Sequence, residues 1–171
     1  MSKGLQRSLS RGAVTRQEIV KQDIKVKNLA VAVADGAPGF GTAVIAGLPQ
    51  GNLLFLGAVA YLQFQTTSAN VTATFDGDYG IGTIPTADND LADAGDADIV
   101  PSTALGAATA KLSPVVRGVS TDALGGGIID NTDGSLELNL NLLIDDAAIS
   151  GAASFTVNGT VSIAYIVMQD D

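Results

Sequence analysis

The chain has 171 residues, enough for one domain with a substantial core and no need of disulfides or metals. It contains no cysteine, histidine or tryptophan, so thiol chemistry, imidazole catalysis and His or Cys zinc sites are excluded. Aromatic residues make up 5% and apolar residues 46%, which predicts an aliphatic core. The formal net charge is −9, unevenly distributed along the chain.

A basic segment opens the chain. Seven of the nine Lys and Arg residues lie within the first 27 positions, and the rest of the chain is strongly acidic. We expect residues 1–23 to form an N-terminal arm, with a capping-box pattern that allows a short helix over Thr15–Gln22, or to be a tail without a role. As an arm it would dock on an acidic or polar protein surface. The partner-binding candidates are Lys3, Arg7, Arg11, Arg16, Ile19 and Lys21.

The same arm argues against nucleic acid and membrane partners. It has no aromatic residues for base stacking, and the acidic remainder of the chain would repel a polyanion. No apolar signal-peptide region follows the charged N-terminus within the first 23 residues, and the most apolar run, Leu53–Leu62, is too short for a transmembrane helix. We therefore expect synthesis and first residence in a host cytoplasm, and no membrane partner.

From Ile24 onward, hydrophobic residues alternate with polar ones, which is typical of strands. The first strand is expected from Ile24 to Val33, with a bulge near Asn28. A second is expected over Phe40–Leu48. A third, over Leu53–Gln65, is apolar on both faces, one carrying Leu53, Phe55, Val59 and Tyr61 and the other Leu54, Leu56, Leu62 and Phe64. Such a strand is expected to be covered by the core on one side and by another chain on the other.

Further strand-like segments follow along the chain. Leu136–Ile144 has the cleanest alternation, with Leu and Ile inward and Glu137, Asn139 and Asn141 outward. Phe155–Met168 is interpreted as one long strand with a bulge at Asn158–Gly159, although a hairpin turn there is the alternative. The shorter candidates are Asn70–Phe75, Tyr79–Ile84, Ile99–Thr103, Ala107–Leu112 and Val115–Val119. This pattern predicts an all-β, jelly-roll-like β-sandwich over residues 24–171.

The acidic stretch Pro85–Asp98 contains enough carboxylates to be a candidate calcium site. Its acids lack the EF-hand spacing, with Ala92 at the fifth position and Asp93 in place of the required glycine. We expect a solvent-facing loop without a metal, and acids in such a loop do not favour the fixed pair of carboxylates that a glycosidase needs. Gly36–Gly41 precedes a strand, so it is a turn and not a phosphate-binding loop. The sequence thus predicts no cofactor and no enzyme activity.

Three groups of residues resemble small structural proteins encoded beside the major capsid protein of tailed bacteriophages. They are Ser2–Ser8 with Val14–Gln17, Phe75–Tyr79 with Ile99–Thr103, and Leu138–Leu140 with Val161–Val167. The resemblance to head-decoration, or cement, proteins implies a jelly-roll-like body that sits as a trimer on the capsid surface. The implied partners are the major capsid protein and further copies of the chain. A receptor- or carbohydrate-binding jelly roll of a phage tail or fibre is the alternative.

Overall fold

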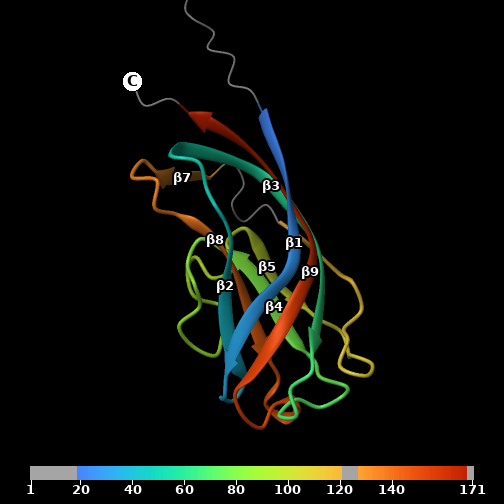
Figure 1. The fold of residues 1–171 in the computed structure, drawn as a ribbon. Helices are drawn as coiled ribbons and strands as arrows, with labels where there is room; N and C mark the ends of the chain where they lie inside the picture. The colour runs from blue at the N-terminus through green and yellow to red at the C-terminus, as the bar shows by residue number, and fades with distance from the viewer. Residues whose placement is uncertain (1–18, 121–126, 169–171) are drawn as a thin grey trace, which may run out of the picture.

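The computed structural model describes residues 19–120 and 127–168, and within them every regular element but one short 3-10 helix, Asp146–Ala148, is a strand (Figure 1). The all-β prediction is confirmed. In chain order the strands are β1 (Ile19–Ala34), β2 (Gly39–Gly47), β3 (Gly51–Thr66), β4 (Gly77–Gly82), β5 (Val100–Ala104), β6 (Val116–Val119), β7 (Ile128–Asn131), β8 (Glu137–Ile144) and β9 (Ala153–Met168).

The nine strands form one antiparallel sheet that curls back on itself. Its order is β5-β4-β8-β2-β1-β9-β3-β6, with β7 paired to β3. β1 and β2 pair over three positions, Ala32 to Ala34, so the sheet folds there into two layers. One layer is β5-β4-β8-β2 and the other is β1-β9-β3 with β6 and β7. β5 and β6 come together at the far side, which nearly closes the sheet and gives the expected jelly-roll-like sandwich.

Three strands of 16 residues each, β1, β9 and β3, run side by side beyond the body of the domain (Figure 1). The expected bulge in β1 is confirmed, because its register with β9 shifts between Val26 and Leu29, and Asn28 has φ 51°. β9 continues through Asn158–Gly159 as a single strand, which rules out the hairpin.

The residues of β3 that face the core are not the ones expected from the sequence. Its register with β9 shifts between Phe55 and Gly57. A bulge inserts one extra residue and exchanges the two faces of everything beyond it. Phe55 is therefore buried on the same side as Leu62 and Phe64, while Tyr61 is exposed. The predicted grouping of Phe55 with Tyr61 on one face was wrong, because an expectation of strict alternation along the strand does not allow for a bulge.

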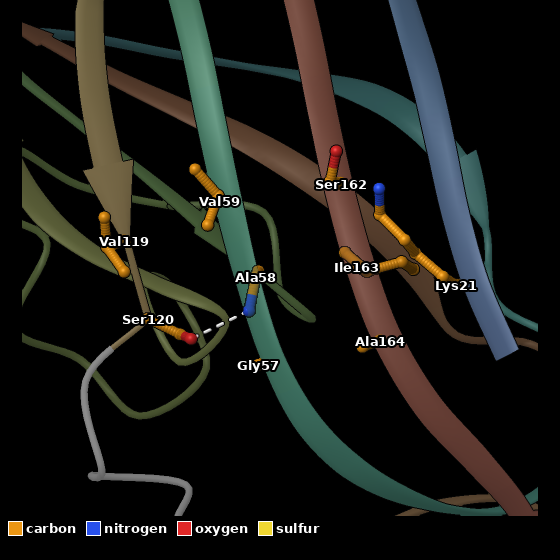
Figure 2. Close-up of a pocket in the computed structure, with 9 residues that line it drawn as sticks. All are labelled: Lys21, Gly57, Ala58, Val59, Val119, Ser120, Ser162, Ile163 and Ala164. Carbon is orange, nitrogen blue, oxygen red and sulfur yellow. Dashed lines mark hydrogen bonds between the residues drawn. The ribbon is translucent and has the colours of Figure 1, made fainter. Parts of the chain in front are cut away.

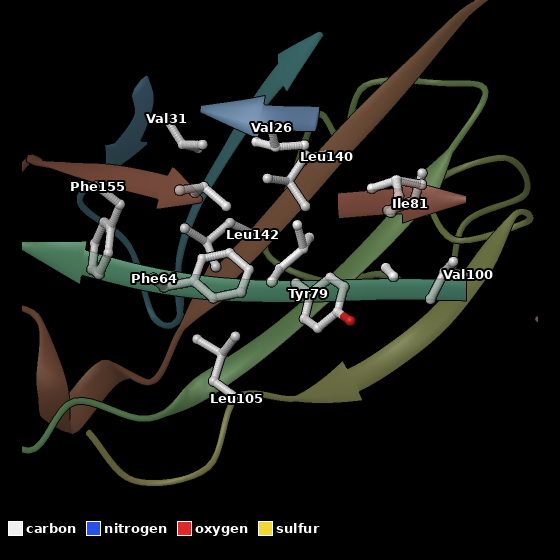
Figure 3. Close-up of a cluster of buried hydrophobic side chains, with 14 of the residues drawn as sticks. Val26, Val31, Phe64, Tyr79, Ile81, Val100, Leu105, Leu140, Leu142 and Phe155 are labelled. Atoms are coloured by element: carbon white, nitrogen blue, oxygen red, sulfur yellow. The ribbon is translucent and has the colours of Figure 1, made fainter. Parts of the chain in front are cut away.

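The core lies between the two layers and is mainly aliphatic, as predicted (Figure 3). Leu140 and Leu142 of β8 pack against a few aromatic side chains from the other elements. The rings of Phe64 and Tyr79 lie 5.3 Å apart. At the closing side, the Tyr79 hydroxyl oxygen lies 2.5 Å from where a Cβ on Gly118 would stand, so glycine lets β6 approach β4 and β5.

The structure departs from several expected boundaries. β1 begins at Ile19, so the last five positions of the expected arm, 19–23, lie in a strand that pairs with β9, and no helix covers 19–22. Asn70–Phe75 and Ala107–Leu112 contribute isolated bridges and not strands. β7 was not expected. These short segments are held in place by contacts with residues distant in the sequence, and the local alternation of apolar and polar residues gives no information about such contacts.

Candidate interaction surface

Four of the six residues expected to bind a partner, Lys3, Arg7, Arg11 and Arg16, lie outside the described residues. The other two lie on the outer face of β1. Ile19 is 66% exposed at the start of the strand. Lys21, two residues further along, has an exposed side chain whose Nζ lies 3.4 Å from Oδ1 of Asp23. The structure thus places an apolar and a cationic side chain next to each other on one face.

Ile19 is one end of a line of aliphatic residues that crosses four strands. It pairs with Ile166 of β9, Ile166 pairs with Leu54 of β3, and Leu54 pairs with Ile128 of β7. Directly opposed residues in antiparallel strands share a face, so these four form one aliphatic row. Ile128 is 60% exposed, and Leu56 in the β3 bulge is exposed beside the row. Sequence reasoning missed the row because its members are far apart in the chain.

A pocket of about 290 Å³ lies next to the aliphatic row (Figure 2). Gly57 of β3 and Ala164 of β9 are opposed in the ladder, and their lack of bulk opens the hollow. Lys21 and Ser162 line one side, and Ser120 lines the other, its hydroxyl accepting a hydrogen bond of 2.7 Å from the Ala58 amide. The pocket extends the apolar face inward and offers few polar groups for a small ligand.

Cations continue the same outer face away from the row. Lys25 of β1, Thr160 of β9, Tyr61 of β3 and Arg117 of β6 form another cross-strand line. Of the cations in the described residues, three are on β1 itself (Lys21, Lys25 and Lys27). This face is therefore apolar at one end and positively charged further along, which fits a protein surface of opposite charge.

The acidic loop between β4 and β5 does not simply face solvent. Asp88, Asp90 and Asp93 are exposed, as expected, but Asp96 is 3% exposed and Leu91 is buried. The loop lies against the outer face of β4 and β8. The expectation of a fully solvent-facing loop is therefore wrong in its middle and end, where the loop packs on the sheet.

One buried side chain of β8 holds the loop in place. Asn141 was expected to face solvent, but it is completely buried beneath the loop. Its Oδ1 accepts a 2.9 Å hydrogen bond from the Thr86 amide, and its Nδ2 donates to the carbonyl oxygens of Ile84, at 2.9 Å, and Asp96, at 2.7 Å. Asn139 is buried on the same face. Both asparagines point away from the core, as expected, but the loop covers them.

Two glycines of β4 make room for this packing. A Cβ on Gly82 would stand 1.9 Å from the Gly95 carbonyl oxygen, and one on Gly80 would stand 2.7 Å from the Ala97 Cβ. Any larger residue at Gly82 would push the loop away. The glycines of β4 thus serve close approach of the loop to the strand.

Burial raises the pKa of the Asp98 carboxyl, although hydrogen bonds from the Thr83 amide (2.9 Å) and hydroxyl (2.8 Å) act in the opposite direction. Burial also raises the pKa of Asp96, and the nearby carboxylates of Asp93 and Asp88 add to the effect. Across residues 19–120 and 127–168, no three or more Asp, Glu, His or Cys side chains form a group that could hold a metal ion.

A second groove, of about 420 Å³, lies on the outer face of β2 and β8. Its walls are Thr83 and Pro85 on one side and Ser135 to Glu137 on the other, and Val44 and Asn139 contribute to its lining. The hydroxyl of Thr42 is buried there without a hydrogen-bond partner. The groove has no aromatic residue among its lining residues, which removes the usual platform for a sugar ring.

No helix in the part of the chain that the structure describes is long and apolar enough to cross a membrane. The fold and its surface define the chain as an all-β domain with an exposed apolar and cationic face.

No family model and no curated protein sequence matches the chain. Among solved structures, it is similar to a chain of the capsid of Ralstonia phage GP4, with 18% identity, a TM-score of 0.37, and 90% of this chain and 86% of that chain covered. It is also similar to a chain of infectious bursal disease virus, Gx strain, with 12% identity, a TM-score of 0.40, and 86% and 33% covered. Because TM-scores below 0.5 do not establish a common fold, the case for function rests on the chain's own residues.

Proposed function

We propose that this chain is a structural virion protein that binds the outer surface of a phage capsid as a homo-oligomer and stabilises the lattice. Its partners are the major capsid protein and further copies of itself, in a trimer as in the decoration proteins that its sequence resembles. The observation that carries the proposal is the aliphatic row on one face, in which Ile19 and Ile128 are exposed at the two ends and Ile166 and Leu54 are partly exposed between them.

The aliphatic row gives the face an adhesive character that needs no chemistry. Burying a fully exposed aliphatic side chain against a partner contributes about 1.5–3 kcal/mol to the free energy of binding. A row of half-exposed residues therefore contributes several kcal/mol per copy. Lys25, further along the face, has no carboxylate within ion-pair distance among the described residues and adds charge that favours an acidic partner. The strand β1 begins at Ile19, which is one end of this row. Repetition around an oligomer multiplies weak contacts, which suits a protein that fastens a lattice.

A carbohydrate- or receptor-binding role receives less support from the surface. Sugar sites use exposed aromatic rings, and among the described residues Tyr61 is the one aromatic side chain that is strongly exposed. Tyr61 lies on the outer face among Lys25, Thr160 and Arg117, and it does not line either groove. The chain also has no histidine or cysteine, and we propose no enzymatic role for it.

The proposal is tested first by locating the protein. Virions of a phage that encodes the chain are purified, separated into heads and tails, and analysed by mass spectrometry. We expect the chain in the head fraction, in a number that matches the symmetry of the lattice. Light scattering coupled to size exclusion then reports the oligomer. Presence in tails alone contradicts the capsid role, and a monomer both free and on the particle contradicts the oligomer.

The aliphatic row is tested by placing a charge on it. Ile19→Asp and Ile128→Asp change exposed side chains and leave the core intact, so both variants should fold. We expect each to reduce occupancy of capsids that lack the protein by about tenfold or more. Val115→Asp is the matched control, since Val115 is 62% exposed but lies near the opposite end of β3. Equal binding by all three variants contradicts the assignment of this face.

A further inference from the structure

The long strand β1 has a free edge. Its ladder with β9 runs from Ile19 to Val33, but on its other side it pairs with β2 only at Ala32, Val33 and Ala34, among residues 19–120 and 127–168. Successive residues of a strand direct their backbone groups to alternate sides. From Ile19 to Val26, before the bulge, every second residue therefore presents an N–H and a C=O with no strand beside it.

The two faces of this edge differ in chemistry. On the inner side, Val20 is opposed to Tyr165, and Ile24 is opposed to Val161, both of them members of the core. Val26, further along, is itself buried. On the outer side stand Lys21, Lys25 and Lys27. Apart from Gln22 on the inner side and Ile19 and Asp23 on the outer side, the edge is apolar toward the core and cationic toward solvent.

The three lysines are not equally available. Lys21 forms an ion pair with Asp23 at 3.4 Å, and Asp23 also accepts a hydrogen bond from the Ser162 hydroxyl. In the described part of the chain, Lys25 and Lys27 have no carboxylate within ion-pair distance. An arriving strand would meet two free positive charges on its outer side and an apolar surface on its inner side.

We propose that the β1 edge binds an extended acidic segment of another protein by strand addition, the segment alternating apolar residues toward the core with Asp or Glu toward solvent. Main-chain hydrogen bonds supply affinity in this mode, and the alternating side chains supply specificity. A strand so placed lies about 4.8 Å from β1, with its acids beside Lys25 and Lys27. This inference concerns the edge of the sheet and holds whether or not the chain belongs to a capsid.

Charge decides among the candidate occupants. Two copies of β1 pairing with each other would bring lysines together, and like charges opposed across a ladder are destabilising. The chain's own N-terminal segment carries Lys3, Arg7, Arg11 and Arg16, so it meets the same repulsion. Exposed lysines also protect sheet edges from unwanted pairing. The lysines disfavour the pairing of neutral and basic strands with this edge, so an acidic strand is the partner that the charge favours.

The test uses the full chain and a labelled peptide of about nine residues, enough to follow most of the edge at ~3.3 Å per residue. The peptide alternates glutamate with valine or threonine, and a second peptide has lysine in place of glutamate. Fluorescence anisotropy at about 0.15 M salt, where charges are screened beyond roughly 8 Å, measures affinity, and amide hydrogen exchange by NMR locates the contact. We expect the glutamate peptide to bind at least about tenfold more tightly than the lysine peptide. It should slow exchange of alternate β1 amides.

Two charge reversals separate strand addition from general attraction. Lys25→Glu should weaken binding of the glutamate peptide about fivefold, because an attraction becomes a repulsion. Arg117→Glu makes the same change of charge on the same cross-strand line but three strands away, roughly 14 Å. Salt screens charges at that separation, so the control should bind normally. Circular dichroism verifies that both variants fold.

Three results overturn the proposal. Equal weakening by Lys25→Glu and Arg117→Glu shows attraction to the whole face and not to the edge. Failure of the glutamate peptide to bind, with the protein folded, shows that the edge does not accept a strand. A dimer of the free chain in which the same β1 amides are already protected shows that a second copy occupies the edge.

Discussion

The amide nitrogen of Asn28 donates a 2.8 Å hydrogen bond to Oδ1 of Asn158, which joins the bulge of β1 to the corresponding point of β9. Asn28 takes the left-handed conformation at φ 51°, and Gly159 follows Asn158 with φ 151°. A Cβ on Gly159 would stand 1.9 Å from the Tyr61 carbonyl oxygen. This side-chain bond joins β1 to β9 where their own ladder is interrupted, while the ladder between β9 and β3 runs through Asn158 and Gly159 without a break.

Removing the Asn141 side-chain amide should release the acidic loop. Asn141→Leu leaves the Thr86 amide and the carbonyl oxygens of Ile84 and Asp96 without their partners, and each such buried group costs about 1–3 kcal/mol. Because the released loop lets water reach part of these groups, we expect less than the full sum, a fall of roughly 2–4 kcal/mol in the free energy of unfolding in urea titrations. Asn89→Ala is the control, since Asn89 is exposed and makes one hydrogen bond, to Ala37. Equal effects of the two substitutions would contradict the role of Asn141.

Two glycine substitutions should have opposite outcomes. Gly82→Ala places a methyl group 1.9 Å from the Gly95 carbonyl oxygen, so the loop must move, and we expect a loss of about 1–3 kcal/mol. Gly47→Ala meets no atom within 4 Å, and the lower entropy of the unfolded chain should leave stability unchanged or slightly higher. Thermal unfolding measures both. A higher Tm for Gly82→Ala would show that the loop does not pack on β4.

Stability should depend on pH through Asp78. Burial raises the pKa of its carboxyl above the ordinary value of 3.8, and the carboxylates of Asp145 and Asp76 raise it further. The folded chain then holds this proton more tightly than the unfolded chain does. The contribution of Asp78 to stability is therefore fully unfavourable above the raised pKa, fades as the pH falls from the raised pKa to the ordinary value, and is absent below the ordinary value.

Asp78→Asn tests this sign directly. The variant should raise the Tm at about pH 7, where the wild-type carboxyl is charged, and should give no gain at about pH 3, where it is protonated. Because Asp78 is partly exposed, the gain should stay below about 1 kcal/mol. The exposed Asp93→Asn is the comparison at both pH values. A gain for Asp78→Asn that persists unchanged at low pH would mean that charge is not its cause.

Two truncations should locate the boundary between arm and domain. Deleting residues 1–18 leaves the described ladder whole, so the Tm should not change, and any loss of capsid binding then belongs to the arm. Deleting residues 1–23 removes the pairs from Ile19 with Ile166 to Asp23 with Ser162 and exposes Tyr165. We expect a loss of about 2 kcal/mol for this second deletion. The same Tm for both deletions would place the boundary after Asp23.

The alternation of apolar and polar residues determined several features before any contact was known. It identified the all-β class, the aliphatic core, the bulge near Asn28 and the single strand through Asn158–Gly159. These follow from a local rule, because neighbouring residues of a strand face opposite sides wherever the strand lies. The charge of the N-terminal segment was likewise a property of sequence alone.

Only the tertiary structure decided which residues meet across strands. Ile19, Leu54, Ile128 and Ile166 form one row because the registers of β1, β9, β3 and β7 align them, and Asn141 is buried because a loop 45 to 57 residues away in sequence lies over it. The free edge of β1 exists because β2 departs after three pairs. Register and packing are set by the whole chain at once, so a pattern that extends over a few residues cannot specify them.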